Sequence, residues 1–125
     1  MISTVAELRT RLAEARAAAP EGARVALIST IGALHDGHID LVHRAREVAD
    51  IVVASTFVNP LRFPNAAAAD AYPRTPDEDE QLLTSLGVDI VFAPEASELL
   101  PDGANTTKVS AGDLGLRYEG RTRPF

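Results

Sequence analysis

Two histidines three residues apart, His35 and His38, are the side chains in this sequence best suited to chemistry. They follow a short apolar run at residues 25–28 and stand where a helix is predicted to begin. The amino end of a helix presents unpaired amides and about half a positive charge, which favours phosphate. Imidazoles on that turn can donate to phosphate oxygens and stabilise a pyrophosphate leaving group. With Gly37 admitting a close ligand, the pattern indicates nucleotidyl transfer.

Other roles for the histidines are weighed against this one. Both could be structural side chains that cap the helix. A zinc site shared with His43 is disfavoured, because the chain has no cysteine and His43 lies off the helical face that a common metal would need. The acidic run at residues 77–80 is better explained as the first turn of a helix than as a metal site. We therefore predict no metal site made by side chains.

The elements predicted around these side chains alternate between helices and apolar strands. Runs such as residues 25–28 are typical of strands buried on both faces of a sheet. Threonine–glutamate pairs at 4–7 and 75–78 are typical of capping boxes. Three strands joined by helices make two βαβ units, which predicts an α/β fold with a parallel sheet. Helices are expected over residues 5–19, 37–49 and 76–86, and strands over residues 25–28, 51–57 and 88–93.

Two loops are predicted at the end of the sheet where open parallel sheets bind ligands. Residues 29–37 follow the first strand, and the proline-containing loop 59–74 follows the second. The last part of the chain is predicted to contain a turn at 101–103, a strand through 108–110 and a helical turn before residue 125.

Length, composition and charge limit the class of protein. The 125 residues suit one compact domain, and 46% hydrophobic with 24% charged residues is typical of a globular protein. No apolar run reaches the ~20 residues of a membrane span, so no membrane partner is expected. A net charge of −6 repels polyanions, so no nucleic-acid partner is expected either. The lack of cysteine is compatible with the cytoplasm, which we predict as the location.

Four blocks of sequence raise the specificity of this interpretation. Residues 29–38, 57–63, 72–75 and 87–94 resemble, in order and spacing, the pantothenate synthetase (pantoate–β-alanine ligase) family. That family is similar to the class I aminoacyl-tRNA synthetases and other histidine-signature nucleotidyltransferases. The resemblance implies a Rossmann-like parallel sheet with flanking helices, and a nucleotide-binding domain over residues 1–125.

The resemblance also implies an activity and the residues that carry it. Pantoate would react with ATP, accompanied by Mg²⁺, to give pantoyl adenylate and pyrophosphate, and β-alanine would then displace AMP. His38, in the role of proton donor, and His35 would be catalytic. Pantoate and β-alanine would be bound by Asn59, Arg62, Tyr72 and Arg123. ATP would be bound by Thr30, Ile31, Gly32, Ala33, Leu34, His35, Asp36, Gly37 and His38.

Several positions depart from the family pattern. Ser29 and Ile31 stand where proline and methionine are usual, and Arg62 replaces a glutamine that bonds pantoate. A guanidinium only donates hydrogen bonds, so Arg62 could pair with the pantoate carboxylate but could not accept from its hydroxyls. A solvent-exposed loop cation is the alternative role for Arg62.

The family's later motifs, which hold the ATP phosphates and magnesium, have no counterpart here, so we expect an incomplete, truncated domain without the carboxyl-terminal domain. Three functions stay open. The first is the nucleotide-binding part of the ligase, weakly active or inactive alone. The second is a nucleotide- or small-acid-binding module without catalysis, and the third is an adenylyltransferase for another substrate. A homodimer is also expected, because a truncated sheet exposes an apolar edge.

Overall fold

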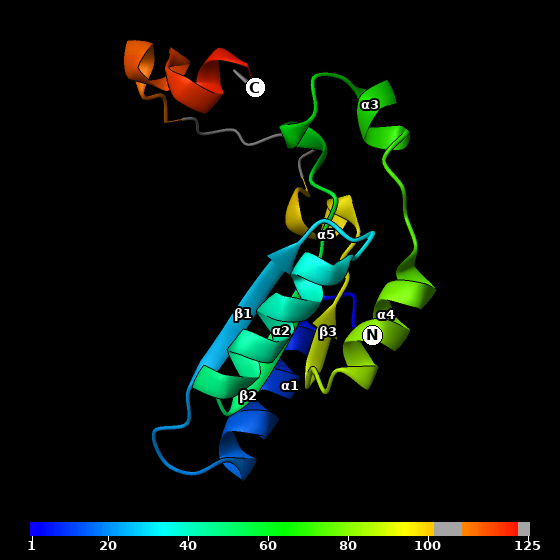
Figure 1. Cartoon of the computed structure of the whole chain (residues 1–125), viewed down its shortest axis with the longest axis vertical. Helices are drawn as coiled ribbons and strands as arrows, with labels where there is room; N and C mark the ends of the chain where they lie inside the picture. Colours follow the sequence, from blue (N-terminus) through cyan, green and yellow to red (C-terminus); the bar gives the residue numbers. More distant parts are fainter. Residues whose placement is uncertain (102–108, 123–125) are drawn as a thin grey trace.

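Three parallel strands form the centre of the fold, as Figure 1 shows. The computed structural model describes residues 1–101 and 109–122. Strands β1 (Val25–Thr30), β2 (Ile51–Thr56) and β3 (Ile90–Phe92) lie in the order β1-β2-β3. All pairs are parallel, with Val25 opposite Ile51 and Val53 opposite Ile90. The predicted α/β class and parallel sheet are confirmed.

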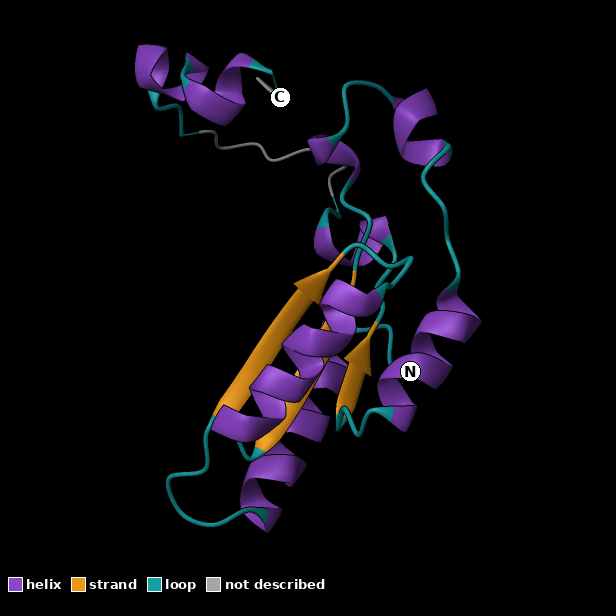
Figure 2. Ribbon diagram, in the orientation of Figure 1, coloured by secondary structure: helices purple, strands orange, loops and turns teal. Residues whose placement is uncertain are grey.

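Helices cover both faces of this sheet (Figure 2). On one face α1 (Val5–Ala18) packs through Leu8 and Leu12 against β2 and β3. On the other face α2 (Asp36–Val48) and α4 (Pro76–Ser85) contribute Val42 and Leu83 to a second apolar cluster. These two clusters hold the carboxyl ends of the strands, and the loops that follow them, in fixed positions. The three predicted helices are confirmed to within one or two residues at either end.

The two predicted capping boxes have different outcomes. At α1 the Thr4 hydroxyl accepts a hydrogen bond from the Glu7 amide at 3.2 Å, which is one half of the predicted box, and no described hydrogen bond joins the Glu7 carboxylate to the Thr4 amide. At α4 the Thr75 side chain makes no capping bond, so the box predicted there is wrong. The physical reason is the Thr75 backbone, whose ψ of 56° lies outside the extended region from which an N-cap side chain reaches the helix.

The prediction that β1 is buried on both faces is also wrong. Leu27 is 68% exposed, although Ile28 beside it is buried on the opposite face. β1 lies at the edge of the described sheet, and the apolar cluster that α1 forms with β2 and β3 reaches β1 at Val25, the first residue of the strand, and not at Leu27. The apolar composition of the run therefore does not reveal which of its faces is covered.

The loop predicted over residues 59–74 contains two short helices. Residues Pro60–Arg62 form the 3₁₀ helix η1, and Ala66–Asp70 form α3. The Asn65 side chain accepts from the Ala68 amide at 2.9 Å and caps α3. Alanine has the highest helix propensity, so a cap suffices to turn this run into a helical turn.

The last part of the chain is only partly described. Asp102, Gly103 and Lys108, in the predicted turn and strand, lie outside the described residues. Val109 and Ser110 form no strand, so that prediction is wrong where it can be compared. The remaining elements are α5 (Ala96–Leu99) and two 3₁₀ helices, η2 (Gly112–Leu116) and η3 (Tyr118–Arg121). These two 3₁₀ helices correspond to the helical turn that was predicted before residue 125.

Every helix in the described residues is too short or too polar to span a bilayer.

The core can be tested at Leu83, which is 1% exposed between α4 and the sheet. We expect Leu83→Ala to lower the free energy of unfolding by about 2–5 kcal/mol, because the lost methyl groups leave a cavity. Leu41→Ala, at a position on α2 that is 54% exposed, is the matched control and should change it by about 0.5 kcal/mol or less. Urea unfolding followed by circular dichroism measures both, and equal effects would contradict the packing described.

Candidate functional site

The candidate site is formed where β1 ends and α2 begins. Gly32 and Ala33, between them, adopt left-handed backbone angles, with φ of 76° and 51°. The φ of 76° favours glycine at the first position, and a Cβ on Gly32 would also lie 3.0 Å from the Asp79 carboxylate. This tight loop carries the chain from the end of β1 directly to His35, which is the N-cap of α2.

The two histidines cap α2, because each ring accepts a hydrogen bond from a backbone amide at the start of the helix. The Nδ1 atom of His35 accepts a hydrogen bond from the Gly37 amide at 3.2 Å. The Nδ1 atom of His38 accepts one from the His35 amide at 3.3 Å. The ring centroids lie 4.1 Å apart. This reciprocal arrangement is a capping box built from imidazoles.

These bonds assign the tautomer of both rings. An Nδ1 atom that accepts a hydrogen bond carries no proton, so in the neutral ring the proton is on Nε2. Within the described residues, no hydrogen bond uses either Nε2 atom. Each ring therefore combines the structural capping role with an Nε2 donor that bonds no described residue, and the two roles considered for His35 and His38 are compatible.

The amides at the start of α2 differ from the prediction of unpaired groups open to phosphate. Those of His35 and Gly37 are bonded to the imidazoles. The His38 amide bonds the His35 carbonyl at 2.8 Å. Gly37 also has a local role, since a Cβ there would lie 3.1 Å from the His35 ring. Within the described residues no hydrogen bond uses the Asp36 amide, so this turn offers that amide and the two imidazole Nε2 atoms as donors to an anion.

The surroundings of His38 lower its pKa from the ordinary 6.5. Partial burial is the main cause, and the neighbouring His35 acts in the same direction, while Asp79 raises it. At neutral pH the ring is therefore uncharged, which is the state that the capping bond through Nδ1 requires.

A cavity of about 640 Å³ adjoins the histidine turn. Its walls include apolar side chains of α1 and the sheet, such as Leu8 and Leu27. The polar groups lie toward the strand ends, and the volume is in the range of small-molecule sites. Of the predicted site residues, it brings together Thr30, Ile31, His38, Asn59 and Arg62.

Other predicted residues are placed differently. The Tyr72 hydroxyl donates to the Gly32 carbonyl at 3.4 Å, and its ring meets Phe63 edge-on with centroids 5.8 Å apart. Tyr72 thus contacts the loop of residues 32–34 that precedes His35, called the histidine loop below, and does not line this cavity. The Asn59 side chain accepts from the Leu61 amide at 3.0 Å, so it also shapes the turn at η1. Arg123 lies outside the described residues.

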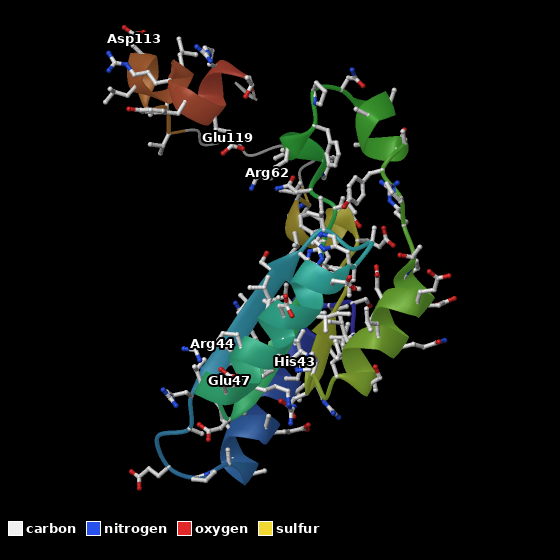
Figure 3. All side chains as sticks on the ribbon, in the orientation of Figure 1. His43, Arg44, Glu47, Arg62, Asp113 and Glu119 are labelled. Carbon is white, nitrogen blue, oxygen red and sulfur yellow. The ribbon has the colours of Figure 1, made fainter. Side chains whose placement is uncertain are left out.

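Figure 3 shows that Arg62 and His43 lie in different parts of the molecule. Arg62 extends from η1 on the side of the molecule where the strands end, and His43 lies farther along α2. Among the described residues, no three histidine, aspartate or glutamate side chains come together as a metal site.

One residue of the site was missed by the sequence analysis. Asp79, interpreted only as part of an acidic first turn, is 5% exposed and accepts hydrogen bonds from the Ala33 and Leu34 amides, both at 3.0 Å. A signal was available, because Asp79 stands four residues before the buried Leu83 and so shares its helical face. A carboxylate on the apolar face of a helix needs a buried partner.

A parallel sheet with helices on both faces, and imidazoles at the first strand–helix turn, define an α/β protein of nucleotidyltransferase type. Two similar solved structures have this fold. The pantothenate synthetase of Thermus thermophilus has a TM-score of 0.79 and 44% identity, covering 98% of this chain and 42% of that chain. The pantoate-beta-alanine ligase of Francisella tularensis, complexed with beta-gamma ATP and beta-alanine, has a TM-score of 0.85 and 31% identity, covering 98% and 46%.

The chain belongs to the pantoate–β-alanine ligase family, whose model matches residues 1–125. The pantothenate synthetase of Leifsonia xyli is 50% identical over 93% of this chain and 40% of its own length. That of Paenarthrobacter aurescens is 46% identical over 98% and 41%. The chain therefore spans about two fifths of the length of these curated relatives.

The capping bonds predict how stability depends on pH. Because the folded state lowers the pKa of His38, the unfolded chain binds more protons, and stability falls as the pH drops from 6.5 through the folded pKa. His38→Asn keeps an acceptor near the Nδ1 position but cannot titrate, so we expect a smaller loss of stability between pH 7 and 5. Urea unfolding at each pH, with NMR titration of the His38 ring, measures this. A His38 midpoint above 6.5 would contradict it.

Proposed function

We propose that this chain forms the nucleotide-binding part of an ATP-dependent ligase that joins pantoate to β-alanine. The observation that carries the proposal is the reciprocal imidazole box, which leaves two Nε2 donors free at the strand ends and places His38 at the cavity wall. Family membership supports the substrates, and the Francisella relative was solved with a form of ATP and with beta-alanine.

The proposed reaction has two steps. A pantoate carboxylate oxygen attacks the α-phosphorus of ATP, and the bond to the bridging oxygen breaks, so pyrophosphate leaves. The β-alanine amine then attacks the acyl carbon of pantoyl adenylate, loses a proton, and AMP leaves. In the first step His35 and His38 donate through Nε2 to phosphate oxygens and stabilise the charge on the leaving pyrophosphate. Residues 30–38 form the ATP side of the site.

The pantoate and β-alanine side is proposed to include Asn59, Arg62, Tyr72 and Arg123. Arg62 lies at the same cavity as His38, where its guanidinium can pair with the pantoate carboxylate. Tyr72 acts on the site by holding the Gly32 carbonyl. The role of Arg123 rests on the family resemblance alone.

The proposal extends to the metal, the location and the assembly. Mg²⁺ prefers phosphate oxygens and water as ligands. Since the described residues contain no group of three histidine, aspartate or glutamate side chains that could hold a metal ion, Mg²⁺ is proposed to bind together with ATP. A cytoplasmic location is proposed because the chain has no cysteine to form disulfides. A homodimer is proposed because β1 lies at the edge of the described sheet, where a second copy can pair with its backbone.

A binding module without ligase chemistry is the second candidate, and Arg62 is the observation that favours it. A guanidinium in place of glutamine holds a carboxylate strongly but cannot accept from a hydroxyl group. A carboxylate held by a cation is a weaker nucleophile, so this substitution favours binding over reaction.

ATP binding tests the imidazole donors. We expect ATP to shift the NMR signals of His35 and His38, and His38→Asn to weaken binding about tenfold, because it removes a donor to a charged oxygen. Asparagine retains an acceptor for the His35 amide, so the fold should persist. His43→Asn, farther along the same helix, is the control and should leave the Kd unchanged. Calorimetry measures both, and equal affinities for wild type and His38→Asn would argue against the phosphate role.

Pantoate-dependent exchange of pyrophosphate into ATP separates the two candidates. We expect Arg62→Gln to increase this exchange about tenfold, because the pantoate carboxylate is then less strongly paired. Exchange that disappears in His38→Asn assigns catalysis to this chain. Saturable ATP binding without exchange, in both wild type and Arg62→Gln, assigns the binding module.

A further inference from the structure

A buried carboxylate lies directly beneath the histidine loop. Asp79, in the first part of α4, is 5% exposed, and each of its oxygens accepts a backbone hydrogen bond. Oδ2 accepts from the Ala33 amide and Oδ1 from the Leu34 amide, both at 3.0 Å. Removing a charge from water is costly, so a buried carboxylate persists only where bonds of this kind compensate for the lost hydration.

The loop that Asp79 holds has a conformation that needs support. Ala33 adopts a left-handed φ of 51°, which costs free energy for a residue with a Cβ. Gly32 approaches the carboxylate so closely that a Cβ would lie 3.0 Å from Oδ2. The Tyr72 hydroxyl holds the Gly32 carbonyl at 3.4 Å. The Thr30 hydroxyl, at the end of β1, also accepts from the Gly32 amide at 3.2 Å, so three side chains from outside residues 32–34 hold the loop.

The loop determines where the histidines stand. Leu34 directly precedes His35, the N-cap of α2, so fixing the Leu34 amide fixes the direction in which the chain enters the helix. That direction sets the positions of both histidine rings, since the His38 ring accepts from the His35 amide and the His35 ring accepts from the Gly37 amide. Asp79 also acts on His38 through its charge, which raises the pKa of that ring against the effect of burial.

We propose that Asp79 is a positioning residue: its carboxylate holds the Ala33 and Leu34 amides and thereby aims the His35 and His38 rings at the bound phosphates. The statement about phosphates rests on the proposed function, and the statement about the loop and the rings does not.

The test compares Asp79→Asn with Asp77→Asn in the full chain. Asparagine has nearly the shape of aspartate but only one acceptor oxygen and no charge, so it can bond only one of the two amides as aspartate does. Asp77, in the same turn of α4, is exposed, so its variant removes the same charge from the helix start without touching the loop. Urea unfolding of both variants identifies conditions in which each is folded.

Three readouts are taken on the folded proteins. We expect Asp79→Asn to speed hydrogen exchange of the Ala33 and Leu34 amides about tenfold, to lower the NMR-measured pKa of His38, and to weaken ATP binding about tenfold. Asp77→Asn should change each rate or affinity by less than about twofold. A residue that served only the stability of α4 would leave the exchange of these two amides and the His38 titration unchanged in the folded protein.

The outcomes separate this inference from the proposed function. If wild type binds ATP, and Asp79→Asn binds it equally with unchanged exchange and titration, the positioning role is overturned. If wild type does not bind ATP, the proposed function fails, and amide exchange with the His38 titration still decides whether Asp79 places the rings. Should Asp79→Asn not fold, Gly32→Ala disturbs the same contact from the loop side, because its Cβ would press on Oδ2. Unchanged exchange and His38 titration in that variant would also overturn the inference.

Discussion

The candidate site depends on one interaction, the acceptance of backbone amides by the Nδ1 atoms of His35 and His38. The usual N-cap side chains satisfy the backbone with an oxygen and offer little beyond it. An imidazole has a second nitrogen on the opposite side of the ring, so satisfying the helix leaves Nε2 as a donor. The same hydrogen bonds therefore stabilise the start of α2 and set the protonation pattern that an anion would meet.

Several elements around the sheet position this capping box. β1 delivers the chain to the loop, α2 carries the rings, and α4 supplies the buried Asp79 beneath them. Tyr72 reaches the same loop from beyond β2. Elements distant in the sequence thus converge on residues 32–34, and their hydrogen bonds offset the cost of the two left-handed residues in this loop.

Membership of the pantoate–β-alanine ligase family places this site in a larger framework. The chain spans about two fifths of the length of its curated relatives, and the histidine turn and the cavity beside it lie within that part. Arg62, at that cavity, supplies donors and no acceptor, because a guanidinium cannot accept a hydrogen bond. The proposed chemistry is therefore most sensitive to the partners of the substrate carboxylate.

Local patterns in the sequence determined the parallel sheet, the helix bounds and the position of the histidines at a strand–helix turn, because apolar period and cap residues act over a few neighbours. Tertiary structure alone decided the rest. That Leu27 is exposed follows from the position of β1 at the edge of the sheet, and that the Asp79 carboxylate meets the Ala33 and Leu34 amides follows from where α4 packs. The direction of the free imidazole nitrogens depends on which atoms the folded chain brings within hydrogen-bonding distance. Hydrogen-bond partners and the covering of an edge strand are properties of contacts between distant segments, which no local pattern specifies.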